Sequence, residues 1–103
     1  DQAALRRIFY KIKIDGPNQA DFLKIFALVA RKRQMPLNAE ALNHLLQVKY
    51  PTIGRVYSNY QPVFLIDQMI SICEFEGKPY HMSPDLIDRA WSNMFVRDEE
   101  IVN

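Results

Sequence analysis

The sequence predicts a mainly α protein, a four-helix bundle preceded by one β-strand. Apolar residues recur at helical spacing in four segments after Pro17, and these segments are bounded by residues typical of helix starts and stops. Residues 8–15 instead show the two-residue alternation of a half-buried strand. With 103 residues, 49% of them hydrophobic and 24% charged, the chain is one globular domain that can bury a modest core.

Charge and composition exclude several classes of function. The net charge of +1, from 13 basic and 12 acidic residues, gives no electrostatic case for nucleic acid or a membrane surface. No apolar run approaches the roughly 20 residues that cross a bilayer. Cys73 is the single cysteine, which excludes an internal disulfide and suits a reducing compartment. No signal peptide is visible and Asp1 stands first, so we expect a cytoplasmic protein whose true N-terminus is missing.

The chain begins with a polar lead, Asp1 to Arg7, that ends in the pair Arg6 and Arg7. The strand, Ile8–Asp15, follows and stops at Gly16-Pro17. A lone strand cannot satisfy its own backbone N–H and C=O groups, and the rest of the chain offers no second strand to pair with it. We therefore expect the chain to be a piece of a larger protein.

The first helix is predicted over residues 18–33. Asn18 can cap it, and Asp21 places a negative charge in the first turn. Its apolar face is made by Phe22, Ile25, Phe26 and Val29. The basic run 31–33 is interpreted as a solvated cluster at the end that favours cations, with a phosphate-binding patch as the alternative.

The second helix is predicted over residues 39–50, capped by Asn38 and stopped by Pro51. Its apolar stripe consists of Leu42, Leu45 and Leu46. His44 lies beside this stripe, and we interpret it as a surface or boundary residue. Residues 52–60 are expected to form an irregular connection.

The third helix, residues 62–76, starts at Pro62 and ends before Gly77. Its apolar residues cover more than one face, which predicts the central helix of the bundle and a buried, inert Cys73. The fourth helix, residues 84–95, has Ser83 as its cap. We expect its inward face to be Ile87, Ala90, Trp91 and Met94, and the charged tail after it to fray.

No catalytic or metal-binding pattern is present in the sequence. His44, His81 and Cys73 have no partner at the three- or four-residue spacing of a metal site on a helix. The three glycines are far apart and form no phosphate-binding loop, and no spacing suggests a nucleophile with its base. We expect no metal site, and we do not expect this chain alone to be an enzyme.

The order of elements resembles the C-terminal part of an AAA+ ATPase module, in which the last core strand is followed by a helical lid. The segment Ala4-Leu5-Arg6-Arg7, the strand and the turn at Asp15-Gly16-Pro17 carry the resemblance, together with the four helices. It implies that residues 1–15 are the end of the core and residues 16–103 are a lid-type bundle. The turn between them would be a hinge.

The resemblance also implies a function. Arg6 or Arg7 matches the arginine finger, which stabilises charge on the γ-phosphate of ATP bound to a neighbouring subunit; a plain surface charge pair is the alternative. ATP and Mg would bind the parent protein, an ATP hydrolase, and not this fragment. The partners would be the upstream core domain and neighbouring subunits of a homo-oligomeric ring, in which the lid couples ATP binding and hydrolysis to motion.

One departure from the family concerns a second arginine. Relatives often carry an arginine near the start of the third lid helix, the sensor 2 position, which contacts the nucleotide of the same subunit. Here the matching stretch is Gln61-Pro62-Val63-Phe64, so Val63 stands in its place. Arg55, in the preceding loop, is the candidate substitute for binding the nucleotide.

The rival hypothesis is a free-standing helical module that binds another protein. A helix-turn-helix DNA-binding domain is a further variant of it. The near-neutral charge argues against DNA, because contacts with phosphates supply much of the affinity in such proteins. A phosphate-binding loop upstream of Asp1 would favour the ATPase over the module.

Overall fold

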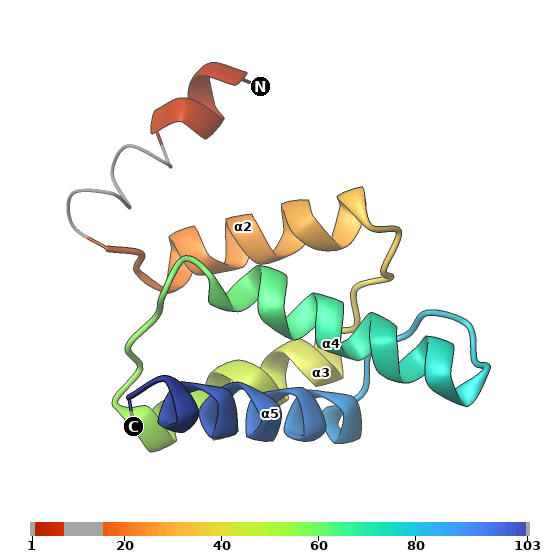
Figure 1. The fold of residues 1–103 in the computed structure, drawn as a ribbon. Coiled ribbons are helices and arrows are strands. Elements are labelled where there is room, and N and C mark those ends of the chain that lie inside the picture. Colours follow the sequence, from red (N-terminus) through yellow and green to blue (C-terminus); the bar gives the residue numbers. More distant parts are fainter. Residues whose placement is uncertain (1, 8–15, 103) are drawn as a thin grey trace.

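The computed structural model describes residues 2–7 and 16–102, with side chains described as far as Phe95. Within these residues the protein is mainly helical, which confirms the predicted class (Figure 1). Residues 2–7 form a short helix. The others are α2 (Gln19–Lys32), α3 (Ala39–His44), α4 (Gln61–Glu76) and α5 (Pro84–Val102), with a π-helical segment η1 (Leu45–Lys49) and a 3-10 turn η2 (Tyr50–Ile53). The predicted strand Ile8–Asp15 lies outside the described residues.

The short helix at residues 2–7 replaces the polar lead that the sequence suggested. The reason lies in its composition, Gln2-Ala3-Ala4-Leu5-Arg6-Arg7. Ala, Leu, Arg and Gln are among the residues with the highest intrinsic preference for a helix. The run of good helix formers therefore decides the local conformation, although it has no amphipathic repeat long enough to show periodicity.

The predicted capping residues hold the starts of three of the four bundle helices, α2, α3 and α5. The Asn18 and Asn38 side chains accept from the backbone N–H groups of Asp21 and Ala41, each at 2.8 Å. Ser83 Oγ accepts from the N–H of Leu86 at 3.1 Å. Each bond satisfies one of the N–H groups that a helix start leaves without an intrahelical partner. These three starts are confirmed.

The second predicted helix differs from the structure at its end. The α-helical pattern stops at His44 and continues as η1 and η2, so the chain is helical past Pro51. Pro51 lies in the first turn of η2, where its missing N–H removes no hydrogen bond. Gly54 ends the turn with a φ of 72°, a left-handed conformation that glycine adopts without strain. The expectation that Pro51 stops this helix was wrong.

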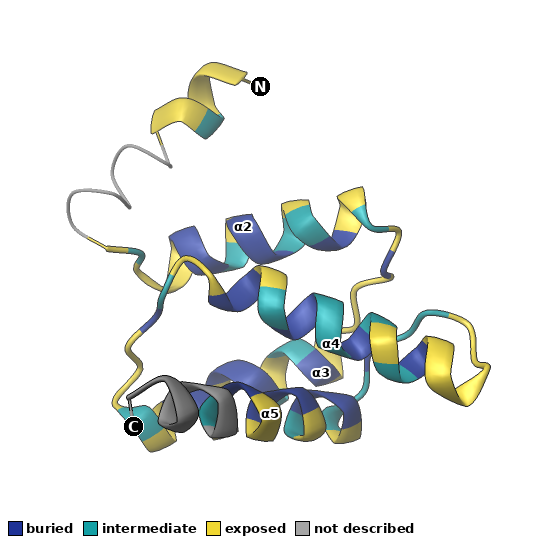
Figure 2. Ribbon diagram, viewed as in Figure 1, coloured by how far each residue is buried: buried dark blue, intermediate teal, exposed yellow. Residues whose placement is uncertain are grey.

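The helices pack in layers around α4, which lies between α2 and α5, while α3 and η1 pack against α5 (Figure 1). Figure 2 shows that the buried faces of these helices point toward one another. The central position predicted for the third helix is confirmed. The core residues range from Phe22 to Met94, and the inward face predicted for α5 is buried. The backbone of α5 continues to Val102, beyond the predicted end at residue 95 and into the tail that we expected to fray.

An aromatic cluster fills the centre of the core. The ring centroid of Tyr50 lies 4.5 Å from that of Tyr57, 4.8 Å from Trp91 and 5.1 Å from Phe22. The Tyr50 hydroxyl donates to Gln61 Oε1 at 2.6 Å, and the N–H of Ser58 donates to the same oxygen at 3.1 Å. Gln61 thus ties η2 and the following loop to the start of α4.

Candidate functional site

The two candidate finger residues are exposed. Arg6 and Arg7 lie on the helix at residues 2–7, where Leu5 is half-buried. None of these residues belongs to the buried core, which begins at Phe22. Arg55 instead follows the η2 turn, directly after Gly54, so the three predicted arginines lie on two different elements.

Arg55 holds the end of a helix. Its Nη1 donates to the backbone carbonyl of Leu46, in η1, at 3.2 Å, and its own N–H donates to the carbonyl of Tyr50 at 2.9 Å. Carbonyl groups at the end of a helix lack intrahelical partners and carry partial negative charge, so a guanidinium stabilises them. The backbone of Arg55 has a left-handed φ of 58°, which turns the chain back toward η1 so that both bonds can form. The rest of the guanidinium is exposed.

Val63, which the resemblance places at the sensor 2 position, opens into a groove. Val63 lies on α4 with 37% of its surface exposed. It lines a groove of about 780 Å³ together with Leu5, Leu28, Val29, Arg31, Lys32 and Arg33. We call this the α2–α4 groove. This groove could not be predicted from the sequence, because α3 and its connections separate Val63 from the basic run 31–33.

The α2–α4 groove combines apolar and cationic groups. Leu28 and Val63, 39% and 37% exposed, contribute the apolar part. Arg33 Nε pairs with Asp67 on α4 at 2.6 Å and so helps to hold the two helices together. Arg31 and Lys32 are exposed and leave the groove with a net positive edge. Such a surface can receive an anionic group that is followed by an apolar one.

A polar cluster joins η1 and α3 to α5. His44 Nε2 lies 2.7 Å from Asp88 Oδ1, and Lys49 Nζ lies 3.2 Å from the same oxygen. The hydrogen bond with His44 is the largest cause that lowers the pKa of the Asp88 carboxyl; burial opposes it, and the hydrogen bond with Lys49 adds a smaller lowering. His44 is half-buried, as its position beside the apolar stripe suggested. The arrangement thus links η1 and α3 to α5 through one carboxylate.

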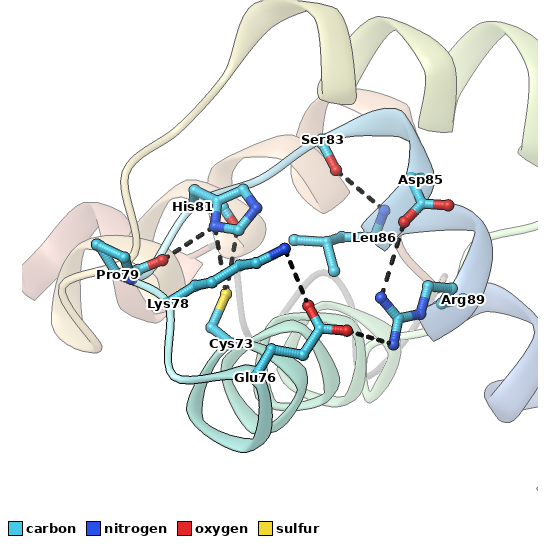
Figure 3. Close-up of polar contacts among 9 residues, drawn as sticks. All are labelled: Cys73, Glu76, Lys78, Pro79, His81, Ser83, Asp85, Leu86 and Arg89. Atoms are coloured by element: carbon cyan, nitrogen blue, oxygen red, sulfur yellow. Dashed lines mark hydrogen bonds and ion pairs between the residues drawn. The ribbon is translucent and has the colours of Figure 1, made fainter.

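Cys73 and His81 lie together at the end of α4, in an arrangement that the sequence did not suggest (Figure 3). The thiol sulfur is 3.5 Å from His81 Nδ1, but Nδ1 is also 2.9 Å from the carbonyl of Pro79. A carbonyl can only accept, so Nδ1 carries the proton and cannot act as a base toward the thiol. Cys73 is fully buried, as the sequence predicted, and its inertness stays a prediction.

An ion-pair network lies on the surface beside this pair, between the end of α4 and the start of α5 (Figure 3). Arg89 contacts Glu76 at 3.1 Å and Asp85 at 3.7 Å, and Lys78 contacts Glu76 at 3.5 Å. The hydrogen bond from Arg89 lowers the pKa of Glu76. The positive charges of Arg89 and Lys78 balance the negative charges of Glu76 and Asp85, so these two carboxylates are already paired. Across the described residues, no three His, Cys, Asp or Glu side chains are arranged to hold a metal ion.

No helix in the described ranges has the length and apolar character needed to span a membrane.

Comparison with known proteins gives one result. The family model described as Domain of unknown function (DUF8689) matches residues 18–93, from the cap of α2 to the last turns of the buried part of α5. The matched region thus coincides with the bundle and leaves out the helix that carries Arg6 and Arg7. No curated protein and no solved structure matches the chain.

Proposed function

The chain belongs to the DUF8689 family, and we propose that its bundle is the helical lid of a cytoplasmic AAA+ ATPase, with residues 1–15 as the end of the ATPase core. In this proposal the lid moves relative to the core as ATP is bound and hydrolysed, and it packs against neighbouring subunits of a ring. Gly16, with a φ of 79°, stands at the junction and suits a hinge, because glycine adopts this conformation without strain.

The exposure of Arg6 and Arg7 is the observation that carries the proposal. Among the described residues, the buried core lies within residues 22–94 and includes neither arginine. Two guanidinium groups ahead of a self-contained bundle are free to reach a phosphate on another subunit. A guanidinium suits that task because it is always charged and donates in a planar fork that matches phosphate oxygens.

ATP and Mg belong to the upstream core in this proposal. The sequence contains no glycine-rich loop that could surround phosphates. Arg55 is a weak candidate for contact with the nucleotide, because Nη1 already binds the carbonyl of Leu46. Arg55 is exposed, so its other N–H groups could contact a nucleotide.

A second candidate function is a protein-interaction module without ATPase activity. The observation that favours it is Phe75, which is 91% exposed near the end of α4. An aromatic ring this exposed is a typical anchor of a protein interface.

ATP hydrolysis by the full-length parent protein distinguishes the two functions. We expect either Arg6→Ala or Arg7→Ala to lower kcat by about 10³-fold or more, the usual effect of losing an arginine finger, without loss of ATP binding. Lys24→Ala, which removes an exposed cation from α2, is the control and should leave kcat unchanged.

Mixing experiments then test action across the subunit interface. Subunits that lack the finger should regain activity when mixed with subunits whose own ATP site is defective, because each supplies what the other lacks. If both arginine variants hydrolyse ATP like the wild type, or if the parent has no ATPase activity, the lid proposal is wrong and the interaction module is favoured.

A further inference from the structure

We propose that the α2–α4 groove binds the acidic C-terminal end of α5 from a second copy of the chain. The inference does not rest on the proposed function, because it concerns association of the chain with itself and requires no nucleotide. It does name a contact that neighbouring subunits of a ring would use.

The groove determines the chemistry of its partner. Leu28 and Val63 expose more than a third of their surface there, so covering them removes apolar area from water. Arg31 and Lys32 stand at its edge, and the charge of Arg33 is already balanced by Asp67. The complementary partner is a segment with two or more carboxylates next to aliphatic residues.

The chain carries one segment of this composition, near its C-terminal end. Asp98, Glu99 and Glu100 are consecutive and are followed by Ile101 and Val102. Elsewhere in the sequence, the acidic residues occur singly or are separated by other residues, as in Glu74-Phe75-Glu76. The charge of the segment 98–102 is opposite to that of the groove, and its aliphatic end matches the exposed leucine and valine.

The arrangement of helices favours a second copy as the source of this segment. α5 lies on the opposite side of α4 from α2 (Figure 1), and its backbone is helical as far as Val102. A helix is too stiff to bend around α4 and reach the groove of its own chain. A contact between two different surfaces of identical chains is heterologous, so it builds a ring or a filament instead of a closed dimer.

The test measures self-association of the full chain by sedimentation velocity at low and high salt. We expect association at about 0.05 M salt that weakens at about 0.5 M, because screening acts on exposed charges. The groove variant Arg31→Glu/Lys32→Glu and the tail variant Glu99→Lys/Glu100→Lys should each weaken association at least about tenfold, since each places like charges together. Lys24→Glu, on the same helix but outside the groove, should have no such effect.

Mixing the two variants provides the decisive measurement. The groove variant and the tail variant should associate with each other, because the reversed charges are complementary again, and circular dichroism checks that each variant keeps its helices. Three outcomes would overturn the proposal: a wild-type chain that stays monomeric at low salt, tail variants that associate like the wild type, or mixed variants that do not associate. The second would show that the segment 98–102 is not what holds the copies together.

Discussion

Tyr50 and Tyr80 each donate a hydrogen bond of 2.6 Å, but in different surroundings. Tyr50 is fully buried, and burial raises the pKa of its phenol far above the ordinary value. Tyr80 bonds to Glu74 at the surface, where water can replace either partner. A comparison of substitutions at the two residues therefore shows how much of the stabilisation by such a hydrogen bond depends on burial.

We expect Tyr50→Phe to lower the free energy of unfolding by about 1 kcal/mol, because it removes a buried hydrogen bond while Gln61 keeps its bond from Ser58. Tyr80→Phe should cause no measurable change. Urea denaturation of both variants tests this, with the ring packing preserved in each. Equal losses from the two substitutions would contradict the assignment of Tyr50 to the stabilising network.

Asp88 should make the stability of the bundle depend on pH. Its pKa is lowered in the folded protein, mainly by the hydrogen bond with His44, so the folded state binds this proton less readily than the unfolded state does. The stabilisation is complete above the ordinary pKa of an aspartate, about 4, and is lost as the pH falls through the lower folded value. Asp88→Asn, which imitates the protonated group, should therefore be less stable than the wild type only above about pH 4.

Chemical denaturation at several pH values measures that difference. As a second check, His44→Gln should move the pKa of Asp88 toward its ordinary value, which NMR titration of the carboxyl group can follow. A constant difference between the wild type and Asp88→Asn across this pH range would show that the ionised carboxylate contributes nothing.

Contacts between residues distant in the sequence were not predictable at this scale. His44 and Asp88 are 44 positions apart, and only the packing of η1 and α3 against α5 makes them neighbours. Cys73 and His81 meet because a loop turns back over the end of α4. Arg55 did carry a local signal: it follows Gly54 at the end of a helix, where basic side chains bind free carbonyl groups. That signal was missed because its position suggested contact with a nucleotide.

At the scale of elements, helix starts were predictable because their causes are local. Asn18, Asn38 and Ser83 each bond within three residues, so the sequence contains all the information needed. The ends depend on tertiary contacts. η1 and η2 continue the chain past the predicted stop because the helical path brings Tyr50 into the aromatic cluster. The finer prediction, a bundle preceded by a strand, stays a prediction.

The buried face of α2 should contribute most of the stability of that element. Phe22 is fully buried and its ring contacts Phe26, Tyr50 and Tyr57. We expect Phe22→Ala to lower the free energy of unfolding by about 3–5 kcal/mol, because it removes these contacts and leaves a cavity. Phe75→Ala, at a ring that is 91% exposed, is the matched control and should have little effect. Comparable losses in thermal denaturation would mean that α2 does not pack as described.

At the scale of the whole molecule, the bundle should fold without residues 1–15. The core of the described residues extends from Phe22 to Met94, so the shortened chain 16–103 keeps every residue that the structure shows to be buried. We expect this chain to unfold cooperatively, with a free energy of unfolding within about 1 kcal/mol of the full chain, a difference typical of changes away from a core. A chain ending at residue 82 is the control: it lacks α5 and the buried side chains of Ile87, Trp91 and Met94, and it should not fold. If the chain 16–103 lost its cooperative transition, residues 1–15 would be part of the bundle, and the proposed division between an ATPase core and its lid at Gly16 would be wrong.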